Sequence, residues 1–514
     1  MDTDVHGVST RRVFGLETEY GITVAGVETV DVVTESIELV RRYTDNGAHM
    51  KWDYQLEDPH LDARGFRARE LLQDTDESAY YEIDKNRPLS FEEIKSDLVL
   101  SNGARFYNDH AHPEYSTPEC TTLRQIVAQD KAGERILAEC ARRRNSKLPA
   151  GQQVCLYKNN SDFVGHSYGC HDNYLMSRDL PWERIVSGIL PFLISRQIFA
   201  GAGKMGVEAE SVVNQPGIYQ ISQRADFFSV LVSIDTMNRR PLVNTRDEPH
   251  ADTTRYRRFH VILGDSNMSE WATAMKIGTT ALVLDLIEQG KMPQLEIAQP
   301  IDANRSISRD QSCRWIIELK DGRKISAIDV QRIYLKAAAQ LDSGDEDHPW
   351  ILQEWEKVLD DLESDPMATR DRIDWAAKKF LLNALQEEEK LSWTDPWLQS
   401  IDLEYHNVDF DAGLYYELVR QGSMKRVATE DDIKAAIYQP PETTRAFFRG
   451  RSVARFNEQI ESIQWDEIVF ATGREPRRVA LPEASAMDAR LAALNRAARN
   501  GKDFGEFLSA IGEL

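Results

Sequence analysis

The stretch GARFYNDHAHPEY, residues 103–115, contains the groups from which the fold and the site are predicted. Its RFYND segment has the alternation typical of a strand, so Arg105, Tyr107 and Asp109 are predicted to share one face. Glu114 follows five residues after Asp109. An arginine beside one carboxylate is often only an ion pair. A second carboxylate favours a magnesium site, because Mg²⁺ is bound by a few carboxylates together with phosphate oxygens.

An earlier segment, RRVFGLETEYGITV, also alternates like a strand and places Glu17 and Glu19 on one face. Two carboxylates this close repel each other unless a cation or a basic group lies beside them. Taken alone, the pair is interpreted as two solvated side chains on an exposed strand. A metal site is the alternative.

The segments GCHDNY and RRFH supply His171, Asn173, Arg258 and His260. Each histidine alone is more often a hydrogen-bonded core residue. Arg258 and His260 are two residues apart and share a strand face, so a cation and a metal-capable imidazole point the same way. Carboxylates, imidazoles and arginines without paired cysteines favour Mg²⁺-nucleotide chemistry over structural zinc.

The order of expected elements indicates an α+β fold, because strands and helices lack a regular βαβ rhythm. Residues 1–437 are predicted to form a large domain and residues 438–514 a small C-terminal domain, with the boundary at the QPPETT segment. Residues 70–98, acidic and poor in apolar side chains, are predicted to be a long mobile insertion. The apolar helix expected over residues 182–201 is predicted to be interrupted at Pro191.

The composition excludes several classes of protein. A formal net charge of -22 argues against broad nucleic-acid binding, which needs clustered lysines and arginines. The five cysteines are odd in number and include no CxxC pair, as expected for idle thiols in a reducing cytoplasm. The sequence has no signal peptide and no apolar run of the roughly 18 residues that a membrane span needs. We therefore expect a cytoplasmic protein that binds neither nucleic acid nor membrane.

Longer segments occur in a characteristic order, among them GLETEYGI, NGARFYNDHAHPEYSTPEC, SYGCHDNYLMSR, SQRADFF, NTRDEPHAD and FHVILGDSNMSEWATAMKIGTTALVL. With them the chain resembles the Pup ligase/depupylase family of the carboxylate–amine ligase superfamily. The likeness runs through nearly the whole chain and is weakest at residues 325–435. The DHAHPEYST motif and the insertion before NGARFYND resemble features of the depupylase branch.

The resemblance implies a glutamine synthetase-like fold, in which a curved antiparallel sheet binds ATP, or ADP plus phosphate, and Mg²⁺. It implies a hydrolase that deamidates the C-terminal glutamine of the protein tag Pup and cleaves Pup from target lysines. Its partners would be Pup and pupylated proteins, with a functional link to the bacterial proteasome.

The resemblance also implies roles for individual residues, carried over by position. Asp109 would be the catalytic aspartate. The metal-binding positions would be Glu17, Tyr107, Glu114, His171 and His260, and the nucleotide contacts Arg105, Thr117, Asn173, Arg258 and Trp465. Asn108 stands where an apolar residue is expected, but on the face turned away from the site.

The chemistry leaves alternatives open. Asp109 is either a nucleophile or a general base, and Arg105 on the same face is expected to keep it ionised. Arg224 and Arg246 are hypothesised to hold the C-terminal carboxylates of Pup, or else to be structural ion pairs. The competing functions are a Pup–protein ligase, a small-molecule glutamate–amine ligase and an inactive Pup-binding adaptor.

Overall fold

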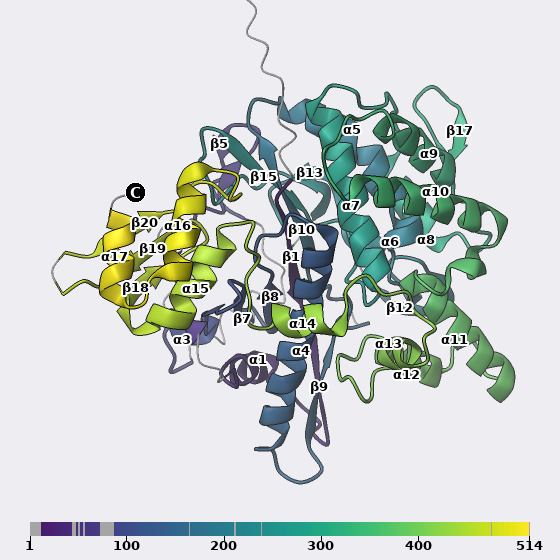
Figure 1. Cartoon of the computed structure of the whole chain (residues 1–514). Coiled ribbons are helices and arrows are strands. Elements are labelled where there is room, and N and C mark those ends of the chain that lie inside the picture. Colours follow the sequence, from purple (N-terminus) through teal and green to yellow (C-terminus); the bar gives the residue numbers. More distant parts are fainter. Residues whose placement is uncertain are drawn as a thin grey trace, which may run out of the picture.

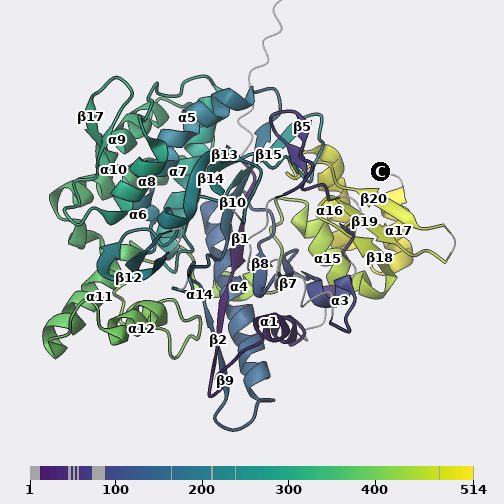
Figure 2. The same ribbon diagram turned by 180° about the vertical axis from the view of Figure 1, so that it is seen from behind.

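The computed structural model describes residues 12–43, 48–49, 52–54, 57–71, 87–163, 165–209, 212–237, 239–473 and 475–512. A central sheet lies between a large helical body and a smaller C-terminal part (Figures 1 and 2). No helix among the described residues is long and apolar enough to cross a membrane.

The central sheet has seven strands in the order β15-β10-β1-β8-β7-β6-β3, and every neighbouring pair is antiparallel. The strands are β1 (Phe14–Glu19), β3 (Ala48–His49), β6 (Leu98–Leu100), β7 (Arg105–Asp109), β8 (His112–Ser116), β10 (Cys170–Ser177) and β15 (Tyr256–Val261). The predicted α+β class and antiparallel sheet are confirmed.

Alternation along β1 gives the sheet one apolar face and one polar face. Phe14, Leu16 and Thr18 are buried, whereas Glu17 and Glu19 on the other face are partly exposed, as a period of two requires. The apolar face packs into the main hydrophobic core with α4 (Leu123–Asn145), α5 (Trp182–Ser195) and α7 (Glu270–Glu288). The polar face is therefore left for the candidate site.

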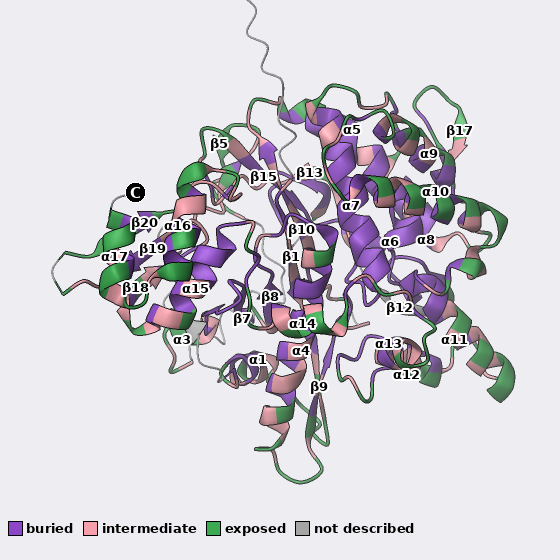
Figure 3. Ribbon diagram, viewed as in Figure 1, coloured by how far each residue is buried: buried purple, intermediate pink, exposed green. Residues whose placement is uncertain are grey.

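Helix α7 lies at the centre of that core, and in Figure 3 it is buried along almost its whole length. The two residues of α7 that are not buried, Asp285 and Glu288, pair with Arg12 just before β1. A helix that is apolar on all sides is stable only when surrounded by protein.

The remaining elements frame this core. The helical body contains α6 (Gln197–Ala200), α8 (Pro300–Arg309), α9 (Ala327–Ala338), α10 (His348–Ser364), α11 (Asp374–Glu389), α12 (Pro396–Glu404), α13 (Leu414–Arg420) and α14 (Glu430–Ala436). Short strand pairs are β2 (Gly21–Ala25) with β9 (Gln153–Tyr157), β4 (Leu61–Asp62) with β5 (Phe66–Arg67), β11 (Lys204–Ala209) with β12 (Val212–Gln220), β13 (Phe228–Ser233) with β14 (Arg240–Asn244) and β16 (Ile316–Glu318) with β17 (Lys324–Ser326). Helix α1 (Val32–Val40) packs against β7 and β8.

The predicted interruption at Pro191 is wrong. Helix α5 continues through this proline to Ser195, whose hydroxyl donates to the carbonyl of Pro191 at 2.7 Å. A proline inside a helix removes one backbone hydrogen bond. Phe192 and Ile194, in the turn that follows Pro191, are completely buried. Their packing in the core keeps the helix intact.

The C-terminal part has its own sheet and its own apolar cluster. Strands β18 (Ile460–Ile463), β19 (Glu467–Phe470) and β20 (Arg477–Ala480) pack with α15 (Ala446–Phe456), α16 (Ala489–Asn500) and α17 (Phe504–Gly512). Trp52 and Val99 belong to the same cluster, so the N-terminal half is joined to it through apolar contacts. The domain boundary after residue 437 stays a prediction.

The predicted insertion over residues 70–98 is corrected at its C-terminal end. Residues 72–86 lie outside the described residues. Beyond them the chain is regular, because α3 (Phe91–Lys95) follows a capping box between Ser90 and Glu93 and leads into β6. The local pattern Ser-x-x-Glu marked this helix start within an otherwise polar stretch.

Candidate active site

The strand register brings the predicted residues into one band across the polar face of the sheet. Glu17 lies opposite His171 on one side and Ser116 on the other. Glu19 lies opposite Glu114, which in turn lies opposite Tyr107. Two clusters result, and they share strand β1.

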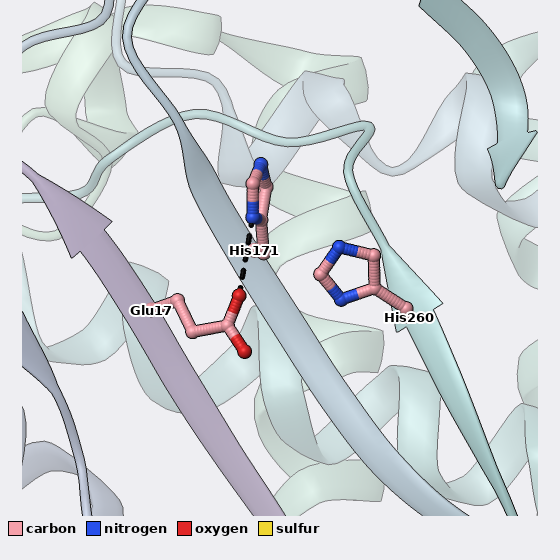
Figure 4. Close-up of side chains that lie close together, drawn as sticks. All are labelled: Glu17, His171 and His260. Carbon is pink, nitrogen blue, oxygen red and sulfur yellow. Dashed lines mark hydrogen bonds and ion pairs between the residues drawn. The ribbon is translucent and has the colours of Figure 1, made fainter. Parts of the chain in front are cut away.

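The first cluster, which we call the imidazole cluster, is Glu17, His171 and His260. These side chains project from β1, β10 and β15 toward one another, and Figure 4 shows the contact between Glu17 and His171. One ligand atom from each lies within 4.8 Å of the others. His171 Nδ1 is 3.2 Å from Glu17 Oε2, and the two imidazole rings are 4.8 Å apart edge to face.

The imidazole cluster is already balanced in charge. Burial opposes ionisation of Glu17, but hydrogen bonding to His171 and the charge of Arg258 outweigh it and lower the pKa of Glu17. Asn173 donates to Glu17 at 3.0 Å and contacts His260 Nδ1 through its side-chain oxygen at 2.8 Å. Burial, aided by Arg258, holds the pKa of His260 well below its usual value, so this imidazole is neutral and able to bind a metal.

The second cluster, which we call the carboxylate cluster, is Glu19, Asp109 and Glu114, again with ligand atoms within 4.8 Å. Tyr107 donates its hydroxyl to Glu114 Oε1 at 2.7 Å, and Ser116 donates to the same oxygen at 3.1 Å. Burial and the neighbouring Glu114 raise the pKa of Tyr107 well above its usual value. In this geometry the Tyr107 phenol is a neutral donor to Glu114.

The carboxylate cluster is not balanced in charge. Burial and the charges of Asp109 and Glu17 raise the pKa of Glu114 far above that of an ordinary glutamate. Asp109 shows the opposite behaviour. Burial opposes its ionisation, but Lys95, whose Nζ is 2.7 Å from Asp109 Oδ1, holds the pKa of Asp109 well below its usual range.

The charge of Arg105 helps to keep Asp109 ionised, as expected, but the cation in contact with Asp109 is Lys95. Arg105 forms its ion pair with Asp97 at 2.7 Å and receives a further contact from Glu57 at 3.6 Å. Its charge still contributes to the low pKa of Asp109, but after that of Lys95. Asp97 forms this ion pair because it lies eight residues before Arg105, across the β6–β7 hairpin.

A pocket opens beside the imidazole cluster, where four of the five predicted nucleotide contacts line its wall. The lining includes Thr117, Asn173, Arg258 and Trp465. The fifth residue, Arg105, lies next to the pocket and stacks on Trp52, which packs edge to face on Trp465.

The C-terminal part contacts the rim of this pocket through Arg445, the N-cap of α15, and Arg449 within that helix. Arg445 donates to Glu119 at 2.7 Å, and Arg449 binds both oxygens of the same carboxylate. The guanidinium of Arg449 also lies 4.7 Å from the ring of Trp465 and donates to its carbonyl. These contacts hold Trp465 at the edge of the pocket.

Arg224 and Arg246 lack an ion pair within the described part of the chain. Arg224 is 2 % exposed and donates to the carbonyl of Ile262 at 2.7 Å and to the hydroxyl of Ser167 at 3.1 Å. Burial and the nearby Arg240 lower the pKa of Arg224 to about 10. Burial also lowers the pKa of Arg246, and its Nε is buried without a hydrogen-bond partner. Buried cations without a counter-ion favour binding of an anion.

Sequence analysis missed several residues of this face. Glu19 was interpreted as solvated, yet His112 Nδ1 lies 3.3 Å from it and Glu114 lies opposite it in the sheet. The strand alternation that selected Glu17 applies equally to Glu19. No sequence pattern pointed to Lys95, because it lies in the segment predicted to be a mobile insertion. His250 lines the pocket and was not selected.

Gly169 stands where β10 approaches the site most closely. A side chain there would begin 2.3 Å from Glu19 Oε1 and 3.0 Å from His171 Nε2. The absence of a side chain at this position therefore lets both clusters keep their geometry.

Comparison with known proteins identifies the family. The family model described as Pup-ligase protein matches residues 12–469. The Pup deamidase/depupylase of Mycobacterium tuberculosis is 44% identical over 476 residues, covering 90% of this chain and 92% of the relative. The Pup–protein ligase of Paenarthrobacter aurescens is 40% identical over 403 residues, covering 74% of this chain and 87% of the relative. The similarity to the deamidase/depupylase thus extends over more of the chain.

Two solved structures of the Pup ligase PafA have the same fold. Its complex with Pup superimposes with a TM-score of 0.75 at 32% identity, covering 95% of this chain and 92% of that one. Its complex with ADP gives a TM-score of 0.71 at 34% identity, covering 85% and 97%. The predicted resemblance is confirmed: the chain belongs to the Pup-ligase protein family.

Proposed function

We propose that this protein hydrolyses amide bonds at the C-terminus of Pup, converting a terminal glutamine to glutamate and releasing Pup from the lysines of modified proteins. The observation that carries the proposal is Asp109, held in contact with Lys95 and within a cluster of three carboxylates on the polar face of the sheet. The relatives named Pup deamidase/depupylase, similar over about nine-tenths of the chain, support the choice of substrate.

The residues of both clusters fit divalent cations. Three carboxylates within 4.8 Å repel one another, and oxygen ligands of this kind suit Mg²⁺. The imidazole cluster adds one more carboxylate and two imidazoles, which also bind divalent metals. Glu19, Asp109 and Glu114 would hold one ion and Glu17, His171 and His260 another.

The pocket lined by Thr117, Asn173, Arg258 and Trp465 fits a nucleotide, and the Pup ligase PafA has been solved with ADP in the same fold. Trp465 and Arg258 would hold the nucleotide, with Arg105 nearby. When bound, Mg²⁺ would supply the positive charge that offsets the repulsion among the carboxylates and favours a developing oxyanion.

Asp109 is proposed as the nucleophile. A carboxylate whose pKa lies far below neutrality is a weak base at neutral pH but is fully ionised for attack. Its oxygen attacks the amide carbon, the C–N bond breaks, and ammonia or the lysine amine leaves with a proton from water. Water then opens the resulting anhydride, which restores Asp109 and leaves glutamate at the end of Pup.

Arg224 and Arg246 are proposed to bind the carboxylates of the Pup C-terminus. Both guanidinium groups are buried, and neither forms an ion pair among the described residues. Arg246 feels the charges of Glu17 and Asp109, so it lies between the two clusters. A guanidinium binds a carboxylate through two parallel hydrogen bonds, which would fix the position of the scissile amide.

The competing function is ligation of Pup to lysine. A test is incubation of the protein, ATP and Mg²⁺ with a purified Pup–protein conjugate, and separately with glutamate-ending Pup and the unmodified target. We expect free Pup and unmodified target from the first reaction and no conjugate from the second. Conjugate formation in the second reaction without cleavage in the first would overturn the proposal in favour of a ligase.

A further inference from the structure

Helix α3 is fastened to the catalytic strand β7 by polar contacts from almost every residue at its C-terminal end. Asn108 donates its side-chain amide to the carbonyl of Ile94 at 3.0 Å. Lys95 binds Asp109 at 2.7 Å, and Asp97 binds Arg105 at 2.7 Å. The polar residue at position 108, unexpected within a strand, is therefore explained by its contact with α3.

Lys95 is held in its place by the backbone around it. Ser96, the residue that ends α3, has a φ of 50°, in the left-handed region that non-glycine residues rarely adopt. On one side of this turn Lys95 contacts Asp109, and on the other side Asp97 contacts Arg105. A strained conformation of this kind persists when surrounding contacts determine it, and it is common at functional sites.

The contact selects one of the two oxygens of Asp109. Lys95 Nζ binds Oδ1, whereas Oδ2 lies 3.9 Å from Nε2 of His110, a side chain that is 52% exposed. Among the described residues, Lys95 is the one cation with a hydrogen bond to this carboxylate. Oδ2 is thereby left free to face the substrate.

We infer that Lys95 is a positioning residue for amide hydrolysis, fixing the rotamer of Asp109 so that Oδ2 is presented to the scissile carbonyl. The inference rests on the proposed role of Asp109. It assigns a function to the C-terminal end of the insertion, because α3 delivers the lysine to the site.

The test compares Lys95→Met and Lys95→Arg with Lys320→Met, a matched change at a lysine that is 65% exposed and pairs with Glu296. We expect kcat for deamidation of glutamine-ending Pup to fall roughly 10- to 100-fold in Lys95→Met, because misplacing a reacting group by about 1 Å costs on the order of 100-fold. KM for Pup and the melting temperature should stay close to those of the wild type. Lys95→Arg should recover part of the lost rate, and Lys320→Met should match the wild type.

A second variant keeps the test valid if Lys95→Met folds poorly. Lys95→Cys is measured before and after alkylation with 2-bromoethylamine, which converts the cysteine into a lysine analogue with the same reach. Identically treated wild-type protein controls for alkylation of Cys155 and Cys313, the native cysteines that are not fully buried. We expect kcat to be low before alkylation and to recover at least severalfold after it.

The outcomes separate this inference from the proposed function. An active wild type with unchanged kcat in both Lys95→Met and unalkylated Lys95→Cys overturns the role of Lys95 and leaves the proposed function intact. A low kcat that alkylation does not restore also overturns it, because the charge at this position is then not what matters. A wild type without deamidase or depupylase activity overturns both.

Discussion

The imidazole cluster and the carboxylate cluster lie on the same face of the sheet, and each includes one glutamate of β1, Glu17 or Glu19. Their electrostatics nevertheless differ. Glu17 has Arg258 and Asn173 within 3.1 Å and a lowered pKa. Among the described residues, the donors to the Glu114 carboxylate are the hydroxyls of Tyr107 and Ser116, and the pKa of Glu114 is strongly raised. In the imidazole cluster the protein itself supplies the groups that stabilise the ionised glutamate, whereas the carboxylate cluster needs additional positive charge.

This difference suggests a division of labour. A balanced cluster next to the pocket is suited to holding a metal and a nucleotide without taking part in bond breaking. The unbalanced carboxylates are suited to a step in which charge develops, because the groups that stabilise it act strongly in a buried setting. The predictions below separate the two sides by changing one group at a time.

The largest effect is expected from Asp109→Asn, on the carboxylate side. The amide is neutral and cannot act as a nucleophile, so cleavage of Pup conjugates should fall by roughly 1,000-fold or more. Nucleotide affinity, measured by calorimetry, should change little, because Asp109 does not line the pocket. A comparable loss of nucleotide affinity would show that the two sides are not separable.

A smaller loss is expected from Glu17→Gln, on the imidazole side. The change keeps the shape but removes the negative charge that pairs with Arg258 and contacts His171. We expect about a 100-fold loss of activity at low Mg²⁺ that is partly recovered at high Mg²⁺, since the variant binds the cation more weakly. Glu296→Gln, an exposed carboxylate that pairs with Lys320 outside both clusters, is the control. Loss that high Mg²⁺ does not reduce would contradict the assignment.

Trp465→Ala tests the pocket without touching either cluster. Loss of aromatic stacking on a base costs about 1–3 kcal/mol, so nucleotide affinity should fall roughly 10-fold or somewhat more. The turnover rate at saturating nucleotide should stay near that of the wild type. Trp465→Phe should be intermediate in affinity. Unchanged affinity in Trp465→Ala would remove this residue from the pocket's function.

The smallest effect, on stability, is expected from Glu114→Gln in metal-free protein. Because burial raises the pKa of Glu114 in the folded state, ionised Glu114 destabilises the fold as pH rises above the unfolded value of about 4.3. The variant lacks this penalty, so its melting temperature at pH 8 should exceed that of the wild type by about 1–2 °C, since about 1 kcal/mol shifts a large protein only slightly.

The advantage of Glu114→Gln should disappear near pH 4, where Glu114 is protonated in both states. Addition of Mg²⁺ should raise the melting temperature of the wild type and leave that of the variant nearly unchanged. A variant less stable than metal-free wild type at pH 8 would contradict the charge imbalance on this side.

Much of the sheet was predictable because its signals are local. Alternation over residues 14–19 and 105–109 correctly placed Glu17, Arg105 and Asp109 on the polar face. Family motifs then brought together residues from strands far apart in sequence, and the register places them in one band.

The errors arose where contacts between distant segments decide the outcome. Pro191 does not end its helix, because core packing outweighs the lost hydrogen bond. Arg105 pairs with Asp97, and the missed residue Lys95 contacts Asp109. A polar, charged segment gives no periodic signal, so the position of Lys95 follows from the turn after α3 and from β7.

The most direct test of the central claim is the intact mass of glutamine-ending Pup after incubation with the protein, ATP and Mg²⁺, with Asp109→Asn in parallel. The account predicts the mass increase that accompanies exchange of an amide NH₂ for OH with the wild type and none with the variant. An equal mass increase with both proteins would place the reacting group elsewhere. No increase with the wild type would show that the carboxylate cluster does not hydrolyse this amide.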